Sequence, residues 1–431
     1  MILLKKGDIK LSTVQTLFFC FIIFSLIFVR DVFSISIHKM IFVLIIPFFM
    51  LISKKDDYIK ILFFIIPLIS GLPGNYIIPI SLIIYLFKSK SLNKNQIFFS
   101  IFVLINETVS YLLYNSIVSD FGTIMAGLSY IPLFFILLYD NNGSKKEFIK
   151  YFLLGVASLC IVLLITNVFS VDGNIFKLFT SGQYRIGDKF IDDETGGLTL
   201  KINSNTLAYF CITSICFCIS MFKKVASKNQ FILVFLIFLF SITGFFTLSR
   251  TFFICYFISI ILYFIFSVRN VKTMIKSLLI LFSISWLLIL FFSNNSFVMQ
   301  GIVSRFELEN ISTMGGRTEI FDNYVNKFAS SPKFMLLGTG STNIRNKYNI
   351  SNSIHNGFFQ VVICYGLPGS LLFFYGIFSC FNKGKKRYTI RKADLVPLII
   401  VILFIQTIQF INPYVILFPY VISKYILVDC F

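Results

Sequence analysis

The chain has 431 residues, of which 57% are hydrophobic, 18% aromatic and only 13% charged, and its formal net charge is +19. A soluble globular domain cannot bury this much apolar surface, so the composition predicts an all-α polytopic membrane protein. A strongly basic balance is also typical of nucleic-acid-binding proteins, but the positions of the basic residues favour a membrane surface, and no nucleic acid is expected as a partner.

Apolar runs close to the length that spans hydrocarbon, about 20 residues, recur along the chain. We predict a single transmembrane domain over residues 1–431 with about 12–14 membrane-spanning helices, and a tight turn or re-entrant bend where Gly and Pro interrupt the apolar run at Ser70–Asn75. The predicted spans are 13–29, 39–53, 58–71, 75–87, 97–114, 122–139, 149–169, 206–222, 231–248, 251–267, 277–292, 354–380, 395–411 and 413–428.

Most of the 38 Lys and Arg residues lie in short loops that alternate with these spans. The positive-inside rule therefore places both termini in the cytoplasm and the two long loops, 170–205 and 293–353, on the outer side. Membrane lipids with anionic head groups are the natural partners of the basic loops. The nine cysteines lie in or beside apolar runs and are interpreted as small apolar fillers.

Two features in the first half of the chain carry ionisable groups. Glu107 falls inside the predicted span 97–114, where an acid is costly. It either faces a substrate cavity or makes a buried structural hydrogen bond or ion pair, and the sequence leaves both open. The first long loop contains Arg185 and the acidic run Asp192–Glu194. Adjacent acids seldom point at one ion, so a solvated loop is favoured over a metal site.

Arg250 lies in a short outer turn between two apolar runs. Its guanidinium would either grip a phosphate with two parallel donors or reach to the interface as an anchor. In the second long loop, residues 318–329 predict an amphipathic helix along the membrane surface, with Arg317 at its first turn. Such a helix start, together with the arginine, makes a cradle for a diphosphate. The apolar stripe of this helix comprises Ile320, Phe321, Tyr324, Val325 and Phe328.

The second loop ends at a polar segment that meets an apolar run. The glycines of Gly338–Gly340 let the chain fold back and are similar to those of a phosphate-binding loop. Further on, Arg345 and then His355 precede the apolar run that starts at Gly357. We predict His355 in the first turn of a membrane-spanning helix, where the helix N-terminus keeps the ring neutral. The alternative is a solvated loop with an incidental histidine.

The order of these motifs resembles the O-antigen polymerase and O-antigen ligase superfamily of bacterial envelope glycosyltransferases. The resemblance covers roughly residues 240–380 and is carried by Ser249-Arg250-Thr251, Gly316-Arg317, Gly338-Thr339-Gly340, His355-Asn356 and Gly366-Leu367-Pro368-Gly369. It implies an integral-membrane glycosyltransferase of the bacterial inner membrane, with an active site that opens to the periplasm.

The resemblance also implies a role for each matching residue. Arg250 and Arg317 would bind the diphosphate of an undecaprenyl-diphosphate-linked oligosaccharide, and His355 would take part in catalysis. The further residues predicted to contact substrate are Arg185, Glu107, Arg345 and Asn356.

The chemistry is coherent on these residues, because a histidine suits proton removal from a hydroxyl and arginines suit a departing diphosphate. We therefore predict a transfer that uses neither metal nor cofactor. The favoured activity is polymerisation of lipid-linked repeat units, with a chain-length regulator protein as a further partner. The alternatives are ligation of the glycan to lipid A-core and, less favoured because no internal repeat is visible, a lipid-linked oligosaccharide flippase or other transporter.

Overall fold

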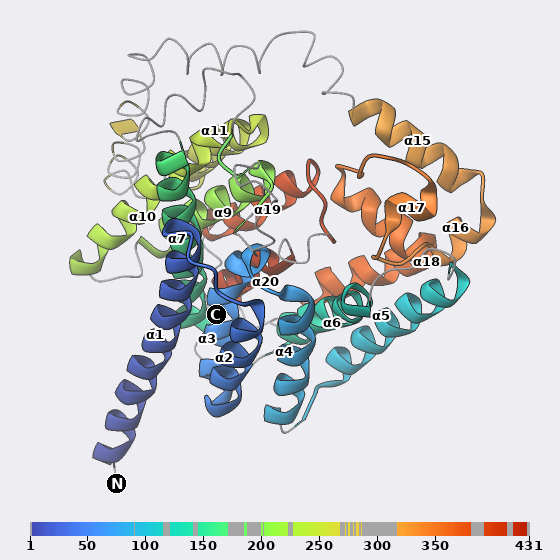
Figure 1. Ribbon diagram of the computed structural model, residues 1–431. Coiled ribbons are helices and arrows are strands. Elements are labelled where there is room, and N and C mark those ends of the chain that lie inside the picture. Colours follow the sequence, from blue (N-terminus) through green and yellow to red (C-terminus); the bar gives the residue numbers. More distant parts are fainter. Residues whose placement is uncertain are drawn as a thin grey trace.

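A computed structural model shows a mainly helical protein (Figure 1). The residues that the structure describes form helices, turns and bends but no β-strand. They are residues 2–89, 91–114, 121–140, 145–170, 185–187, 200, 202–222, 227–267, 272, 275, 279, 282, 283, 286, 317–380, 392–411 and 417–428.

The helices follow the apolar runs of the sequence closely, which confirms the all-α polytopic membrane fold. Five helices are long and apolar enough to cross a membrane, and five shorter apolar helices accompany them in the described ranges. The long helices are α1 (Ile2–Val32), α5 (Lys94–Leu113), α7 (Lys145–Ser170), α9 (Ser204–Phe222) and α18 (Gly357–Ser379). The shorter ones are α2 (Lys39–Ile52), α4 (Gly74–Lys88), α6 (Phe121–Leu138), α10 (Ser227–Phe246) and α11 (Arg250–Ser267).

Prolines and glycines divide the remaining apolar runs into short pieces. The predicted third span is α3 (Lys55–Ile65) followed by the 3₁₀ helix η1 (Ile66–Gly71), which has Pro67 in its first turn. A tight turn then leads into α4, as predicted, with the N–H of Gly74 donating to the carbonyl of Leu72 at 2.7 Å. Near the C-terminus lie η3 (Lys392–Leu395), α19 (Val396–Ile405) and α20 (Phe418–Val428). Most of the predicted span 277–292 lies outside the described residues.

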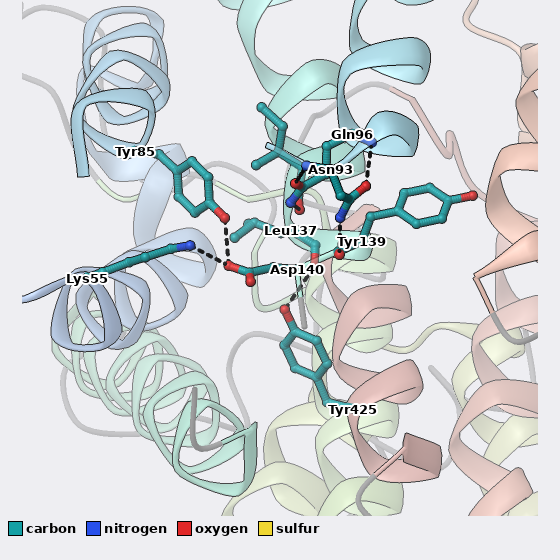
Figure 2. A network of polar contacts seen from close by, with 9 residues as sticks. Lys55, Tyr85, Asn93, Gln96, Leu137, Tyr139, Asp140 and Tyr425 are labelled. Atoms are coloured by element: carbon teal, nitrogen blue, oxygen red, sulfur yellow. Dashed lines mark hydrogen bonds and ion pairs between the residues drawn. The ribbon is translucent and has the colours of Figure 1, made fainter. Parts of the chain in front are cut away.

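The C-terminal end of α6 shows how this fold satisfies helix ends inside an apolar bundle (Figure 2). The last four carbonyls of a helix have no partner within the helix and must find donors elsewhere. Here four side chains donate to the consecutive carbonyls of residues 136–139, and a lysine among them also complements the negative end of the helix dipole. The donors are Gln96, Tyr425, Lys424 and Asn93, in the order of the carbonyls they bind.

Beside these carbonyls, the carboxylate of Asp140 accepts the hydroxyl of Tyr85 at 2.6 Å and pairs with the ammonium group of Lys55 at 3.4 Å (Figure 2). These contacts join α3, α4, α6 and α20 at one end of the bundle. The eight described cysteines are buried free thiols, as predicted.

Three polar-loop helices gather beside the bundle on top of α18 (Figure 1). They are α15 (Arg317–Ala329), α16 (Pro332–Leu337) and α17 (Ile344–Tyr348). Helix α16 packs on α18, and α15 packs on α16. The segment 338–356, which includes α17, joins α16 to α18 and carries His355 to the start of α18.

Candidate active site

Helix α18 is broken near its middle, at Gly366. The backbone there has φ 66° and ψ −179°, outside the helical region, and Pro368 follows two residues later. In an unbroken helix the carbonyl of Cys364 would accept from residue 368, but proline has no N–H to donate. The break also removes the helical hydrogen bond to the carbonyl of Ile363. Two backbone acceptors inside an apolar helix must therefore find donors elsewhere.

The glycine-containing turn Gly338–Gly340 supplies those donors. The N–H of Thr339 donates to the carbonyl of Ile363 at 3.0 Å, and the N–H of Gly340 donates to that of Cys364 at 2.8 Å. The chain thus folds back onto α18, as predicted. However, two N–H groups of this turn are bound to protein carbonyls, so the glycines serve docking on α18 and do not form a phosphate-binding loop.

Glu107 of α5 holds the next residue of the same loop. Its carboxylate is only 5% exposed, accepts the N–H of Ser341 at 2.9 and 3.0 Å, and accepts the hydroxyl of Tyr365 at 3.3 Å. The ammonium group of Lys347 donates to the carbonyl of Thr339 at 2.6 Å. Burial lowers the pKa of Lys347, while the Glu107 carboxylate acts in the opposite direction. This geometry favours the structural alternative for Glu107, which positions the loop.

The amphipathic helix predicted over residues 318–329 is α15, and its stripe faces the protein. Tyr324 and Phe328 are its buried residues. The Phe328 ring lies against Phe359 of α18 at 5.9 Å between centroids, and Phe321 lies against the same ring at 5.0 Å. The apolar stripe therefore packs on the first turn of α18, which fixes α15 beside the segment that precedes that helix.

Polar side chains of α15 also hold the loop that leads to the histidine. The hydroxyl of Tyr324 donates to the carbonyl of Asn352 at 3.0 Å, and the ammonium group of Lys327 donates to the carbonyl of Tyr348 at 2.8 Å. Because α15 begins at Arg317, the same helix that carries this arginine restrains the loop before His355.

His355 lies just before α18 and outside it, so the prediction that it occupies the first helical turn is wrong. Asn356 is the N-cap, with its side-chain oxygen accepting the N–H of Phe359 at 3.0 Å, and the helix begins at Gly357. Asparagine is among the strongest N-caps, which explains why the helix starts after it. The His355 ring is half-buried, and burial lowers its pKa below the ordinary value, with a further lowering from the charge of Arg317. The ring is thus favoured in its neutral form, through burial and a neighbouring charge.

Arg185 and Arg250 are held at one junction of three helices. The guanidinium of Arg185 lies 3.5 Å from the hydroxyl of Ser204, the first residue of α9. The next residue of that helix, Asn205, accepts the hydroxyl of Ser249 at 3.0 Å. Arg250 follows Ser249 directly and opens α11. The first long loop and the turn between α10 and α11 therefore meet at the start of α9.

Arg317 is linked electrostatically to both of these arginines and to the histidine. Burial lowers the pKa of Arg317, and the charges of Arg250 and Arg185 lower it further. Of the three arginines, Arg317 is the one whose charge acts on His355. Arginine stays charged even so, and the unfavourable term is the repulsion between like charges. An anion among these groups would relieve that repulsion.

The arrangement combines an anion site with a neutral base. Three guanidinium groups can bind a phosphate or diphosphate with paired, charge-assisted hydrogen bonds. A neutral imidazole near Arg317 can accept a proton from a hydroxyl. The site thus suits a reaction in which a hydroxyl attacks and a phosphorylated group leaves.

The other predicted site residues lie elsewhere or play local roles. Asn356 caps α18 with its side-chain oxygen. Arg345 is exposed on α17, where its guanidinium lies 3.5 Å from the carbonyl of Ser351. The acidic run Asp192–Glu194 lies outside the described residues, as does Gly316. Sequence reasoning assigned no role to Lys347 or Tyr365, since nothing in their local pattern indicates that they would meet Glu107.

One comparison with known proteins identifies a related family. Residues 235–374 match the family model described as O-Antigen ligase. This interval contains Arg250, Arg317 and His355, whereas Arg185 and Glu107 lie before it. No curated protein and no solved structure matches the chain.

Proposed function

We propose that this protein, which belongs through residues 235–374 to the O-antigen polymerase and ligase superfamily, is a membrane glycosyltransferase that polymerises lipid-linked oligosaccharide repeat units. The donor is a growing glycan on undecaprenyl diphosphate, and the acceptor is a hydroxyl of the next lipid-linked unit. The observation that carries the proposal is that Arg185 and Arg250 meet at the start of α9, while the charges of both act on Arg317 and the charge of Arg317 acts on His355.

The proposed step is a displacement at the anomeric carbon of the donor. The acceptor oxygen forms a bond to that carbon, and the bond from the carbon to the diphosphate oxygen breaks with its electron pair. His355 accepts the proton of the acceptor hydroxyl, and the three arginines stabilise the charge on the departing undecaprenyl diphosphate. The guanidinium groups supply the positive charge that this leaving group needs, so the transfer is proposed to be independent of metal.

The surroundings of the site suit a lipid-linked substrate. His355 and the start of α18 lie where a polar loop meets one of the five helices long enough to span a membrane. A diphosphate whose lipid tail lies in hydrocarbon would present itself at this depth. The charge pattern of the short loops supports the inner membrane with the site on the periplasmic side and both termini in the cytoplasm.

A second candidate is ligation of the finished glycan to lipid A-core, because the matching family model is described as O-Antigen ligase. The two activities use the same donor and the same chemistry at the anomeric carbon. The lipopolysaccharide ladder of a deletion strain separates them. Loss of a polymerase leaves core that carries one repeat unit, whereas loss of a ligase leaves bare core.

The direct test uses the purified full-length protein in lipid nanodiscs with a defined lipid-linked repeat unit. Products longer than one unit, with release of undecaprenyl diphosphate, are expected from the wild type without added metal and in the presence of a chelator. A requirement for a divalent cation would contradict the metal-independent mechanism. Movement of the lipid-linked unit across vesicles without any elongation would instead support a transporter.

A further inference from the structure

A small polar cavity lies where the chain approaches His355, and Arg185, Arg250 and Arg317 are not among its described wall residues. Its volume is about 100 Å³, and Ser353 and Ile354, the two residues before His355, form part of its wall. Residues of α15, α17 and α18 contribute to its wall. The other polar side chains of the wall are Tyr324, Asn343, Arg345, Asn346, Gln360 and Gln409.

Four of the polar side chains are amides, and none of the described wall residues carries a carboxylate. A carboxamide carries both donors and an acceptor, which matches a sugar hydroxyl that donates and accepts at once. A cation would require carboxylate or carbonyl oxygens, and a phosphate would favour several cationic groups. Among the described wall residues Arg345 is the single cation, so the chemistry of the wall fits a neutral polyol such as a sugar ring.

The wall is held in place by contacts behind it. Gln360 is 1% exposed, and its side-chain oxygen accepts the N–H of Ile411 at 2.9 Å, so the group it can offer to a ligand is its NH₂. The hydroxyl of Tyr324 is bound to the carbonyl of Asn352. Asn343 precedes α17, but its side chain does not cap that helix. Polar groups fixed in this way bind a ligand with little loss of side-chain entropy.

The position of the cavity relates it to one of the two substrates. A donor must place its diphosphate among Arg185, Arg250 and Arg317. The attacking hydroxyl must lie within hydrogen-bond reach of the base, about 2.6–3.2 Å. Ser353 and Ile354 of the cavity wall directly precede His355 in the chain, and the described wall residues include none of Arg185, Arg250 and Arg317.

We propose that this amide-lined cavity is the acceptor subsite, and that it binds the sugar residue whose hydroxyl attacks the donor. The inference rests on the glycosyltransferase function proposed above. It adds that the acceptor is recognised through the hydroxyl groups of one sugar, and that Asn346, Gln360 and Gln409 contribute to specificity.

The test measures sugar binding without the lipid diphosphate. The probe is the repeat-unit oligosaccharide released from its lipid by mild acid, titrated against the full-length protein in nanodiscs and followed by ligand-observed NMR. We expect the wild type to bind it. Asn346→Ala and Gln409→Ala should each weaken binding about 3- to 10-fold, the factor that corresponds to one or two neutral hydrogen bonds. Arg317→Lys should leave binding unchanged, because the probe has no diphosphate.

The matched control is Asn326→Ala, which removes an exposed amide from α15 outside the cavity and should bind like the wild type. Equal binding by the wild type and both cavity variants would overturn the subsite, as would loss of binding in Arg317→Lys. Absence of wild-type binding would overturn it too. If the wild type binds the oligosaccharide but never elongates a lipid-linked unit, the proposed function fails while the sugar site stands.

Discussion

Replacing Gly366 by Ala should detach the loop 338–356 from α18. The position has φ 66° and ψ −179°, a region that side chains avoid, and occupying it costs about 1–3 kcal/mol. A Cβ there would also lie 2.5 Å from the carbonyl oxygen of Leu336, at the end of α16. Because that contact is with backbone, α16 and the turn that follows it must move away.

Movement of the turn breaks two buried hydrogen bonds. The N–H groups of Thr339 and Gly340 would leave the carbonyls of Ile363 and Cys364, and each lost bond costs about 0.5–1.5 kcal/mol. Together with the backbone strain this gives about 2–6 kcal/mol, a large part of the 5–15 kcal/mol that stabilises a typical folded protein. We expect local release of the loop before global unfolding, because the rest of the bundle keeps its own contacts.

The activity should fall by about 10²-fold or more, since a displacement of about 1 Å at a catalytic group has that effect. The assays are elongation of a lipid-linked unit by the purified variant and limited proteolysis of loop 338–356. Gly338→Ala should behave alike, because its Cβ would lie 2.3 Å from the carbonyl oxygen of Cys364.

Gly369→Ala is the matched control on the same helix. Its Cβ would meet only side-chain atoms, the nearest at 3.0 Å on Tyr365, so activity within about 2-fold of the wild type is expected. A Gly366→Ala enzyme with normal elongation and an intact loop would refute the docking role of the break in α18.

Four further predictions concern the site and its orientation. A cysteine at Asn323, exposed on α15, should react with an impermeant thiol reagent from the periplasmic side, and labelling only after the inner membrane is opened would invert the proposed topology. Arg250→Lys and Arg317→Lys should each lower the elongation rate about 10²-fold at matched protein levels, because an ammonium group cannot form the paired hydrogen bonds of a guanidinium to a diphosphate. Normal glycan ladders would instead indicate that the two arginines are membrane anchors. Glu107→Gln should retain some activity but lower the thermal stability of the loop 338–356, because the glutamine amide can accept the Ser341 N–H through only one oxygen. An unchanged melting curve would argue against the positioning role of Glu107. Activity should fall as pH drops through the lowered pKa of His355, below about 6.5. Arg317→Met should move this loss of activity to higher pH, because the charge that repels the protonated ring is gone. NMR titration of the ring in a His38→Asn background, where His355 is the only histidine, measures the same pKa shift directly.

The helices could be predicted from hydropathy because each apolar run must satisfy its backbone internally in a membrane. The predicted span 39–53 and helix α2 differ by one residue, and the amphipathic helix 318–329 begins one residue earlier as α15. The start of α18 was placed too early because apolar content alone does not mark a cap. Asn356 carried a usable signal, since asparagine is a preferred N-cap, and it would have placed His355 outside the helix.

The long-range contacts of the site could not be predicted from local patterns. Glu107 and Ser341 are 234 positions apart, and Gln409 reaches the cavity from beyond α19. Gly366 and Pro368 were visible as a motif, but the docking of a second loop on the freed carbonyls depends on the packing of α16. The glycines of the 338–340 turn predict a phosphate loop only because their local pattern does not show that the turn docks on α18.

Helix α15 links the two substrate sites that the structure suggests. It contributes Arg317 to the arginine group at its first residue and Tyr324 to the cavity seven residues later. Residues seven apart lie on the same face of a helix and are separated by about 10 Å along its axis, at 1.5 Å per residue. A sugar ring joined to a diphosphate extends over a similar length, so one rigid helix can set the distance between a bound diphosphate and an acceptor sugar. Because Lys327 also ties this helix to the loop before His355, a change that loosens α15 must disturb the anion site, the cavity and the base together.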